Sequence, residues 1–210
     1  KRGPQQLSVV TAAKEAGVGY ILYTSFERVN ESGTSPIEFV AASHLATEKA
    51  IKASGIPYTI FRNNLYADLI PVFLGEKVLE TGAYWPSGET KTAFVLREDM
   101  AEAAANVLTS EGHEGRDYYI SGNENISFAE IAAIISEASG KKVPFISPGQ
   151  QEYKAALTGA GVPAEYVNLF AGFAEAIRQG EFINEKSDLE KLLGHKPASV
   201  AGFLKQTYAA

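Results

Sequence analysis

The two stretches that decide the fold are Tyr20-Ile21-Leu22-Tyr23, which runs into Thr24-Ser25, and Tyr58-Thr59-Ile60-Phe61, which runs into Arg62-Asn63-Asn64. Each apolar run has the length and composition of a short buried strand. Helical patterns precede both runs, and this alternation of helix and strand predicts right-handed crossovers in a parallel sheet. Ligands bind beyond the carboxyl ends of parallel strands, so we expect the two polar clusters to lie at a functional site.

Beyond Asn64 the pattern of strands and helices becomes less regular. Residues 66–79 are predicted to form a helix that kinks at Pro71. Short strands are predicted over residues 92–96 and 117–121, on either side of an Ala-rich helix. These elements extend the sheet part of the molecule.

The second half of the chain is predicted to be mostly helical. Ser127 and Glu130 have the spacing of a capping box that starts a helix, and helical patterns dominate from residue 148 onward. We therefore expect an α/β protein with a sheet lobe over residues 1–120 and a smaller, mostly helical lobe over residues 121–210. A cleft between two such lobes is a common site for small molecules.

Composition limits the classes of function. The 210 residues carry a formal net charge of −6, which argues against a nucleic-acid or anionic-membrane surface. The chain has no cysteine, and its three histidines lack the spacing of a metal site, so we predict no metal centre. No apolar run approaches the roughly 18 residues typical of a membrane span, so a cytoplasmic protein is expected.

Four stretches in register carry a family resemblance. They are Ala12-Ala13-Lys14-Glu15-Ala16-Gly17-Val18, His44-Leu45-Ala46-Thr47-Glu48-Lys49, the segment from Ser54 to Tyr66, and Gly112-His113-Glu114-Gly115. In this order they resemble the NmrA-like branch of the short-chain dehydrogenases, and within it the type 2 NAD(P)H:quinone oxidoreductases. The resemblance implies a Rossmann-like parallel sheet, NADPH or NADH as cofactor, and a small quinone-like substrate.

The resemblance also implies which residues form the site. In the family, the polar residues after the second strand line the nicotinamide side of the cofactor; here these are Asn63, Asn64, Leu65, Tyr66, Ala67 and Asp68. Thr24 and Ser25 occupy the place of a hydroxyl beside the nicotinamide. In the alternative interpretation, Asn63-Asn64 cap the following helix and Thr24-Ser25 form a turn.

His44 and Glu48 occupy the place of the Tyr-x-x-x-Lys pair that donates a proton in most short-chain dehydrogenases. The i, i+4 spacing puts both side chains on one helix face. Because the tyrosine is absent, the pattern favours reduction of a quinone, which needs less acid catalysis than a carbonyl. His44 is then a candidate catalytic residue in contact with the substrate, together with Asn64 and Tyr66. The alternative is a solvated helix face.

The Gly-rich loop and first strands of the family have no counterpart in the sequence, which begins at Lys1-Arg2-Gly3-Pro4 beside a helix. Three interpretations are open: a fragment of a longer enzyme, a chain that pairs with a separate N-terminal piece, or a short natural relative. We favour a fragment, because Pro4 to Gly17 keeps a full helix. The exposed sheet edge would invite pairing with another strand, for example in a homodimer.

The first functional hypothesis is hydride transfer from NAD(P)H to quinones or similar small electrophilic acceptors. A second is a non-catalytic NmrA-like regulator that senses dinucleotides. A third is an inactive fragment that associates with itself through the sheet edge. The sequence leaves open the natural acceptor and the choice between NADH and NADPH, because the residues that make this choice would lie in the absent segment.

Overall fold

The main sheet of the protein is parallel, as predicted. The structure is a computed structural model that describes residues 2–209. The three strands of this sheet lie in the order β1 (Ile21–Phe26), β2 (Tyr58–Asn63) and β5 (Arg116–Ile120). Phe26 pairs with Asn63, and Asn63 pairs with Ile120. The three carboxyl ends therefore lie side by side along one edge of the sheet, and the predicted α/β class is confirmed.

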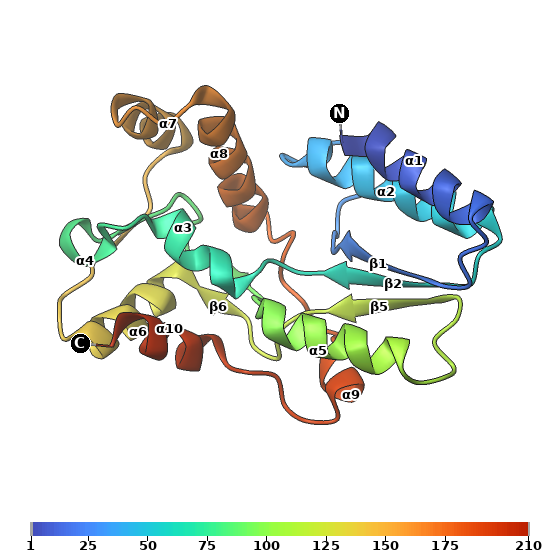
Figure 1. Cartoon of the computed structure of the whole chain (residues 1–210). Coiled ribbons are helices and arrows are strands. Elements are labelled where there is room, and N and C mark those ends of the chain that lie inside the picture. Colours follow the sequence, from blue (N-terminus) through green and yellow to red (C-terminus); the bar gives the residue numbers. More distant parts are fainter. Residues whose placement is uncertain (1, 210) are drawn as a thin grey trace.

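Helices cover both faces of this sheet (Figure 1). One face carries α1 (Arg2–Glu15) and α2 (Glu38–Ser54), and the other carries α5 (Arg97–Leu108) and α9 (Leu189–Leu193). Phe61 and Ile120 of the sheet belong to the same apolar core as Met100 of α5 and Leu189 of α9. The core of the sheet lobe thus includes a helix from the second half of the chain, and the domain boundary at residue 120 stays a prediction.

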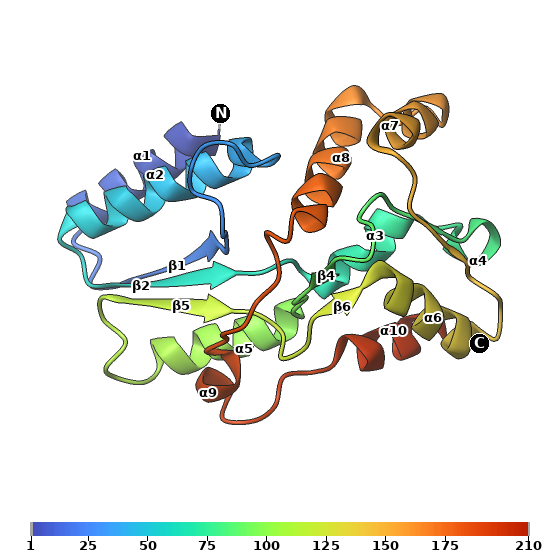
Figure 2. The same cartoon turned by 180° about the vertical axis from the view of Figure 1, so that it is seen from behind.

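The second part of the molecule surrounds a larger apolar core. Its elements are η1 (Ala67–Leu69), α3 (Ile70–Leu74), α4 (Val78–Thr81), β3 (Ala83–Tyr84), β4 (Lys91–Thr92), β6 (Ile126–Ser127), α6 (Phe128–Ser139), β7 (Phe145–Ile146), α7 (Gln150–Gly159), α8 (Ala164–Arg178) and α10 (Val200–Tyr208). Figure 2 shows this part from behind, with α8 beside the loop that leads into α2. Within residues 2–209, no helix is both long and apolar enough to cross a bilayer.

The single helix predicted over residues 66–79 is wrong. The structure has three short helical segments there, η1, α3 and α4. Gly75 ends α3 with a φ of +79°, a left-handed conformation that glycine adopts without steric cost. Pro71 lies in the first turn of α3, where its missing N–H is not needed, so it causes no kink.

Two smaller predictions have different outcomes. The strand predicted over residues 92–96 reduces to β4, which pairs with β6, and to a single bridge between Tyr66 and Val95. The capping box is confirmed: the Ser127 hydroxyl accepts from the Glu130 N–H at 3.2 Å, and the Glu130 carboxylate accepts from the Ser127 N–H at 2.8 Å. Local helix-start signals were therefore more informative than apolar runs in this region.

Candidate functional site

A cavity of about 200 Å³ lies at the carboxyl ends of β1 and β2, where the sequence predicts the site. The predicted residues that line it are Thr24, Ser25, His44, Asn63, Asn64, Leu65 and Tyr66. Helix α8 contributes the apolar side chain of Phe173 and α2 contributes that of Val40. The fold thus brings both polar clusters together and encloses them between helices from the two parts of the molecule.

Two predicted residues, Ala67 and Asp68, do not line this cavity. Ala67 is completely buried. Asp68 Oδ2 accepts from the backbone N–H of Arg97 at 3.0 Å, at the start of α5. Asp68 therefore satisfies one of the N–H groups that a helix start leaves free, and this contact explains its position without a ligand.

Asn63 and Asn64 line the same cavity but use their side-chain amides differently. Asn64 Nδ2 donates to Glu27 Oε2 at 2.9 Å and to the Phe182 carbonyl at 3.3 Å, and its Oδ1 accepts from the Leu65 N–H at 2.7 Å. Asn63 Oδ1 is buried and has no hydrogen-bond partner in the described part of the chain. The capping interpretation is wrong, because no side chain caps η1.

Glu27 is a buried carboxyl group that joins the ends of all three strands. It follows β1, accepts from Asn64 after β2, and accepts from the hydroxyl of Ser121 after β5. Burial raises the pKa of Glu27, and the hydrogen bonds from Ser121 and Asn64 offset only part of this effect. Sequence reasoning missed Glu27, although its place directly after the first strand was a usable signal.

His44 is 5% exposed, which excludes the interpretation of a solvated position on the helix face. Its Nδ1 lies 2.7 Å from the Tyr23 hydroxyl, and its ring stacks on Phe26 with 6.0 Å between ring centroids. Burial lowers the pKa of His44 to about 4, and the positive charges of Arg2 and Arg28 act in the same direction. His44 is therefore uncharged at neutral pH.

Glu48 is also buried, and its carboxylate joins two arginines and Ser25 in an ionic network next to the cavity. Its carboxylate oxygens lie 3.0 Å from Arg28 Nη1 and 3.0 Å from Arg62 Nη2, and the Ser25 hydroxyl donates to it. Burial alone would raise the pKa of Glu48, but the hydrogen bonds from Arg28 and Ser25 and the charges of both arginines outweigh burial and lower it. Because Ser25 donates to Glu48, its hydroxyl oxygen remains available as an acceptor.

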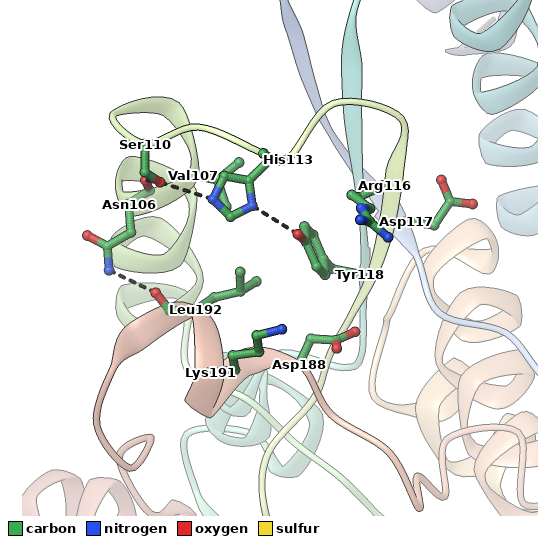
Figure 3. A pocket seen from close by; sticks show the side chains of 11 residues that line it. Asn106, Val107, Ser110, His113, Arg116, Asp117, Tyr118, Asp188, Lys191 and Leu192 are labelled. Carbon is green, nitrogen blue, oxygen red and sulfur yellow. Dashed lines mark hydrogen bonds between the residues drawn. The ribbon is translucent and has the colours of Figure 1, made fainter.

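A second cavity, of about 540 Å³, lies at the opposite edge of the sheet near the amino end of β5 (Figure 3). The ring of His113 bridges two hydroxyl groups there, with Nε2 3.0 Å from Ser110 Oγ and Nδ1 2.9 Å from Tyr118 Oη. Arg116 and Lys191 at its rim are exposed. Among the described residues, no group of three or more His, Asp or Glu side chains is arranged to hold a metal ion.

The sequence pattern of the NmrA-like family matches residues 3–204. Quinone oxidoreductase 2 from Escherichia coli (strain K12) is 34% identical to this chain over 202 residues, which are 96% of this chain and 69% of that relative. The chain therefore belongs to the NmrA-like family, as the four stretches in register predict.

Two solved structures extend this similarity to three dimensions. An NADPH-dependent quinone oxidoreductase from Escherichia coli superposes with a TM-score of 0.88 at 31% identity, over 98% of this chain and 73% of that one. The Citrobacter triphenylmethane reductase complexed with NADP(H) gives a TM-score of 0.84 at 37% identity, over 96% of this chain and 70% of that one. The Rossmann-like fold that the resemblance implies is confirmed.

Proposed function

We propose that this protein is an NAD(P)H-dependent reductase of quinones or similar electrophilic acceptors. The observation that carries the proposal is Asn63 Oδ1, a buried acceptor without a hydrogen-bond partner among residues 2–209, at a cavity on the carboxyl edge of a parallel sheet. A buried polar atom of this kind is costly unless a ligand or water satisfies it. Relatives that act on quinones or triphenylmethane dyes with NADPH or NADP(H) support the same assignment.

The residues of the cavity suit the nicotinamide half of the cofactor. Asn63 Oδ1 would accept from a carboxamide or a ribose hydroxyl, and the Ser25 oxygen, which already donates its proton to Glu48, would accept a second such bond. A bound reduced nicotinamide supplies a hydride, and a quinone that takes up this hydride needs one further proton to become a hydroquinone. Asn64 is already bonded to Glu27 and Phe182, so we assign it the role of positioning Leu65 and Tyr66.

We assign His44 a packing role, in which its uncharged ring lines the cavity and donates no proton to the substrate. Its pKa of about 4 leaves it without a dissociable proton of useful acidity at neutral pH. The second proton of the hydroquinone would then come from water. No acidic side chain is needed for this step, because the oxygens of a reduced quinone take up protons from water. The site is therefore suited to acceptors that need a hydride but no strong acid.

The test is a titration of the protein with NADPH, followed by addition of a simple benzoquinone while absorbance at the nicotinamide band is recorded. We expect binding and quinone-dependent oxidation. Asn63→Ala should weaken NADPH binding by about 1–3 kcal/mol, or roughly 5- to 150-fold. The matched control is Asn106→Ala at the second cavity, which should leave NADPH affinity unchanged.

Each other outcome has a distinct meaning. Binding without turnover would favour the regulator that senses dinucleotides, and absence of binding would overturn the proposal for this chain. Equal weakening by Asn63→Ala and Asn106→Ala would show that the site is assigned to the wrong residues. A second titration with NADH, compared with the NADPH titration, shows which of the two nucleotides the protein prefers.

We also propose that the free edge of β1 pairs with a strand of another chain segment. Among the described residues, β1 pairs with β2 alone, so its other edge presents unpaired backbone groups. A second copy of this chain would be one source of such a strand. Sedimentation at several protein concentrations tests self-association, and a monomer at all of them would exclude the second copy.

A further inference from the structure

The larger cavity, near the amino end of β5, lies between three elements of the sheet lobe. It has a volume of about 540 Å³ and is lined by the end of α5 and the turn after it, by the start of β5, and by α9 (Figure 3). Sites for small molecules have volumes of roughly 300–1,000 Å³. The cavity lies at the edge of the sheet opposite to the candidate functional site, so a ligand bound there would occupy a separate site.

Hydrogen bonds hold the walls of this cavity in place. Asn106 Nδ2 of α5 donates to the Leu192 carbonyl of α9 at 3.0 Å. The start of α9 is joined to β5 by two more bonds: the Asp188 N–H donates to the Tyr119 carbonyl at 2.8 Å, and Asp188 Oδ2 accepts from the Tyr119 N–H at 2.9 Å. Because the walls are fixed before a ligand arrives, little ordering is needed on binding.

The hydrogen bonds inside the cavity have a defined direction. Ser110 Oγ donates to the Asn106 carbonyl, so it accepts from His113 Nε2, which lies 3.0 Å away. In this tautomer of the neutral imidazole Nδ1 is an acceptor, and the Tyr118 hydroxyl donates to it at 2.9 Å. The Tyr118 oxygen has then used its proton, and its lone pairs can accept a hydrogen bond from a hydroxyl group of a ligand.

Two cations line the cavity without an anionic partner. Arg116 of β5 and Lys191 of α9 form no ion pair within residues 2–209. Figure 3 shows them on different sides of the Tyr118 ring. Burial raises the pKa of Tyr118, and the charge of Arg116 partly offsets this rise, so that charge acts at the Tyr118 hydroxyl.

Two carboxylates also line the cavity, and they offset these cations only in part. Asp117 Oδ2 is already paired with Lys52 Nζ at 2.7 Å and with Arg62 Nη2 at 3.2 Å. Arg116 and Lys191 therefore face the charge of Asp188, which leaves one positive charge in excess (two minus one). An anion is thus favoured here, although the chain as a whole has a net charge of −6.

From these observations we propose that the larger cavity binds a small phosphate ester that carries hydroxyl groups. The phosphate group, with a charge of about −1.5 to −2 at neutral pH, lies between Arg116 and Lys191. A hydroxyl group of the ligand donates to the Tyr118 oxygen, which His113 and Ser110 keep oriented as an acceptor. This site does not depend on the proposed reductase function.

The test is isothermal titration calorimetry of the full chain with glycerol 3-phosphate at constant ionic strength, and we expect saturable binding. Arg116→Gln and Lys191→Gln should each weaken binding by roughly three- to tenfold, because each removes one charge-assisted contact. Tyr118→Phe should weaken it by roughly two- to fivefold. Lys142→Gln is the matched control, because it removes an exposed lysine outside the cavity, and it should leave the affinity unchanged.

Two further probes separate the contributions of charge and hydroxyl. Glycerol lacks the phosphate group and should not bind. Sulfate is a dianion without a hydroxyl group, so it should bind equally well to the parent and to Tyr118→Phe. Asn63→Ala, at the candidate functional site, should leave the affinity for glycerol 3-phosphate unchanged.

Four results would overturn the proposal or one of its parts. No saturable binding of glycerol 3-phosphate in the millimolar range would exclude the site, and an equal loss in Lys142→Gln would show attraction by exposed charge in general. Binding of glycerol as tight as that of glycerol 3-phosphate would contradict the roles of Arg116 and Lys191. Loss of sulfate binding in Tyr118→Phe would contradict the role of its hydroxyl. A loss of affinity in Asn63→Ala would move the phosphate ester to the smaller cavity, whatever the result for NADPH.

Discussion

The cavity at the carboxyl ends of β1 and β2 has a volume of about 200 Å³, whereas the cavity at the amino end of β5 has about 540 Å³. The larger cavity contains Ser110, His113 and Tyr118, three side chains that could serve catalysis, but these groups hydrogen-bond to one another. Each cavity has a buried oxygen without a hydrogen-bond partner in residues 2–209, Asn63 Oδ1 at the smaller cavity and Asp117 Oδ1 at the larger.

The two cavities differ in the burial of the titratable groups around them, and this difference favours the smaller cavity as the functional site in spite of its smaller volume. Around the smaller cavity, Glu27, His44 and Glu48 are all at most 5% exposed, and burial is the largest influence on the pKa of each. Such groups are held in the protein at an energetic cost, and perturbed titratable groups cluster at functional sites. The variants below test whether this contrast holds.

The largest effect is expected from breaking the ionic network below the smaller cavity. Glu48→Ala removes the buried carboxylate partner of Arg28, which is itself buried and keeps only the exposed Glu31 as an ion-pair partner. Removal of one member of a buried pair costs about 3–5 kcal/mol of unfolding free energy, measurable by urea denaturation. Lys52→Ala breaks a half-exposed pair with Asp117 near the larger cavity and should cost less than about 1 kcal/mol. Similar losses of unfolding free energy in the two variants would contradict the proposed difference between the two cavities.

The next effect concerns His44 and pH. The pKa of His44 is lowered to about 4 from an ordinary 6.5, so the unfolded chain binds more protons than the folded one between these values. The stability contributed by neutral His44 is present above pH 6.5 and is lost as the pH falls toward 4. The free energy of unfolding should fall by at most about 3 kcal/mol over this pH range, and partial screening by solvent makes the decrease smaller.

Urea denaturation between pH 4 and 7 measures this loss, and His44→Gln should remove that part of the pH dependence. The matched variant at the larger cavity, His113→Gln, should keep it. A parent protein whose stability does not decline below pH 6.5 would show that His44 is not buried as described.

Much of the fold could be predicted from sequence because its signals are local. The apolar runs at Tyr20 and Tyr58 and the capping box at Ser127 depend on residues only a few positions apart. Where a prediction was wrong, as for residues 66–79, a single glycine, Gly75, ended a helix that the apolar pattern continued.

The candidate cavity lies where the sequence predicts a site, but its hydrogen bonds could not be predicted. Asn63 and Asn64 are adjacent and chemically identical, and only the fold shows that Asn64 is bonded to Glu27 and to Phe182, which is 118 positions away along the chain. Likewise, the helical spacing of His44 and Glu48 predicted a shared face, but not that this face is buried and that Glu48 pairs with Arg28 from the loop between β1 and α2. Partners distant in sequence decide which of two similar side chains is free to bind a ligand.

A smaller effect is expected at Glu27. Because burial raises its pKa, the stability that the neutral carboxyl group contributes is present below its ordinary value of 4.5 and is lost as the pH rises through the raised pKa. Glu27→Gln keeps an acceptor for Asn64 without a charge, so the variant should be more stable than the parent at pH 7 and nearly equal at pH 4. Each unit of raised pKa corresponds to about 1.4 kcal/mol. Thermal unfolding at the two pH values measures the difference, and a variant less stable at pH 7 would refute this account.

The smallest effect is expected from the larger cavity. His113→Ala removes two side-chain hydrogen bonds, to Ser110 and to Tyr118, at a half-buried position. The freed hydroxyl groups can bind water, so the unfolding free energy should fall by about 1 kcal/mol or less. NADPH affinity and the rate of quinone reduction should not change, because His113 lies at the opposite edge of the sheet from Asn63. A loss of NADPH affinity as large as that of Asn63→Ala would move the site to the larger cavity, and the burial of titratable groups would then be the wrong criterion for this protein.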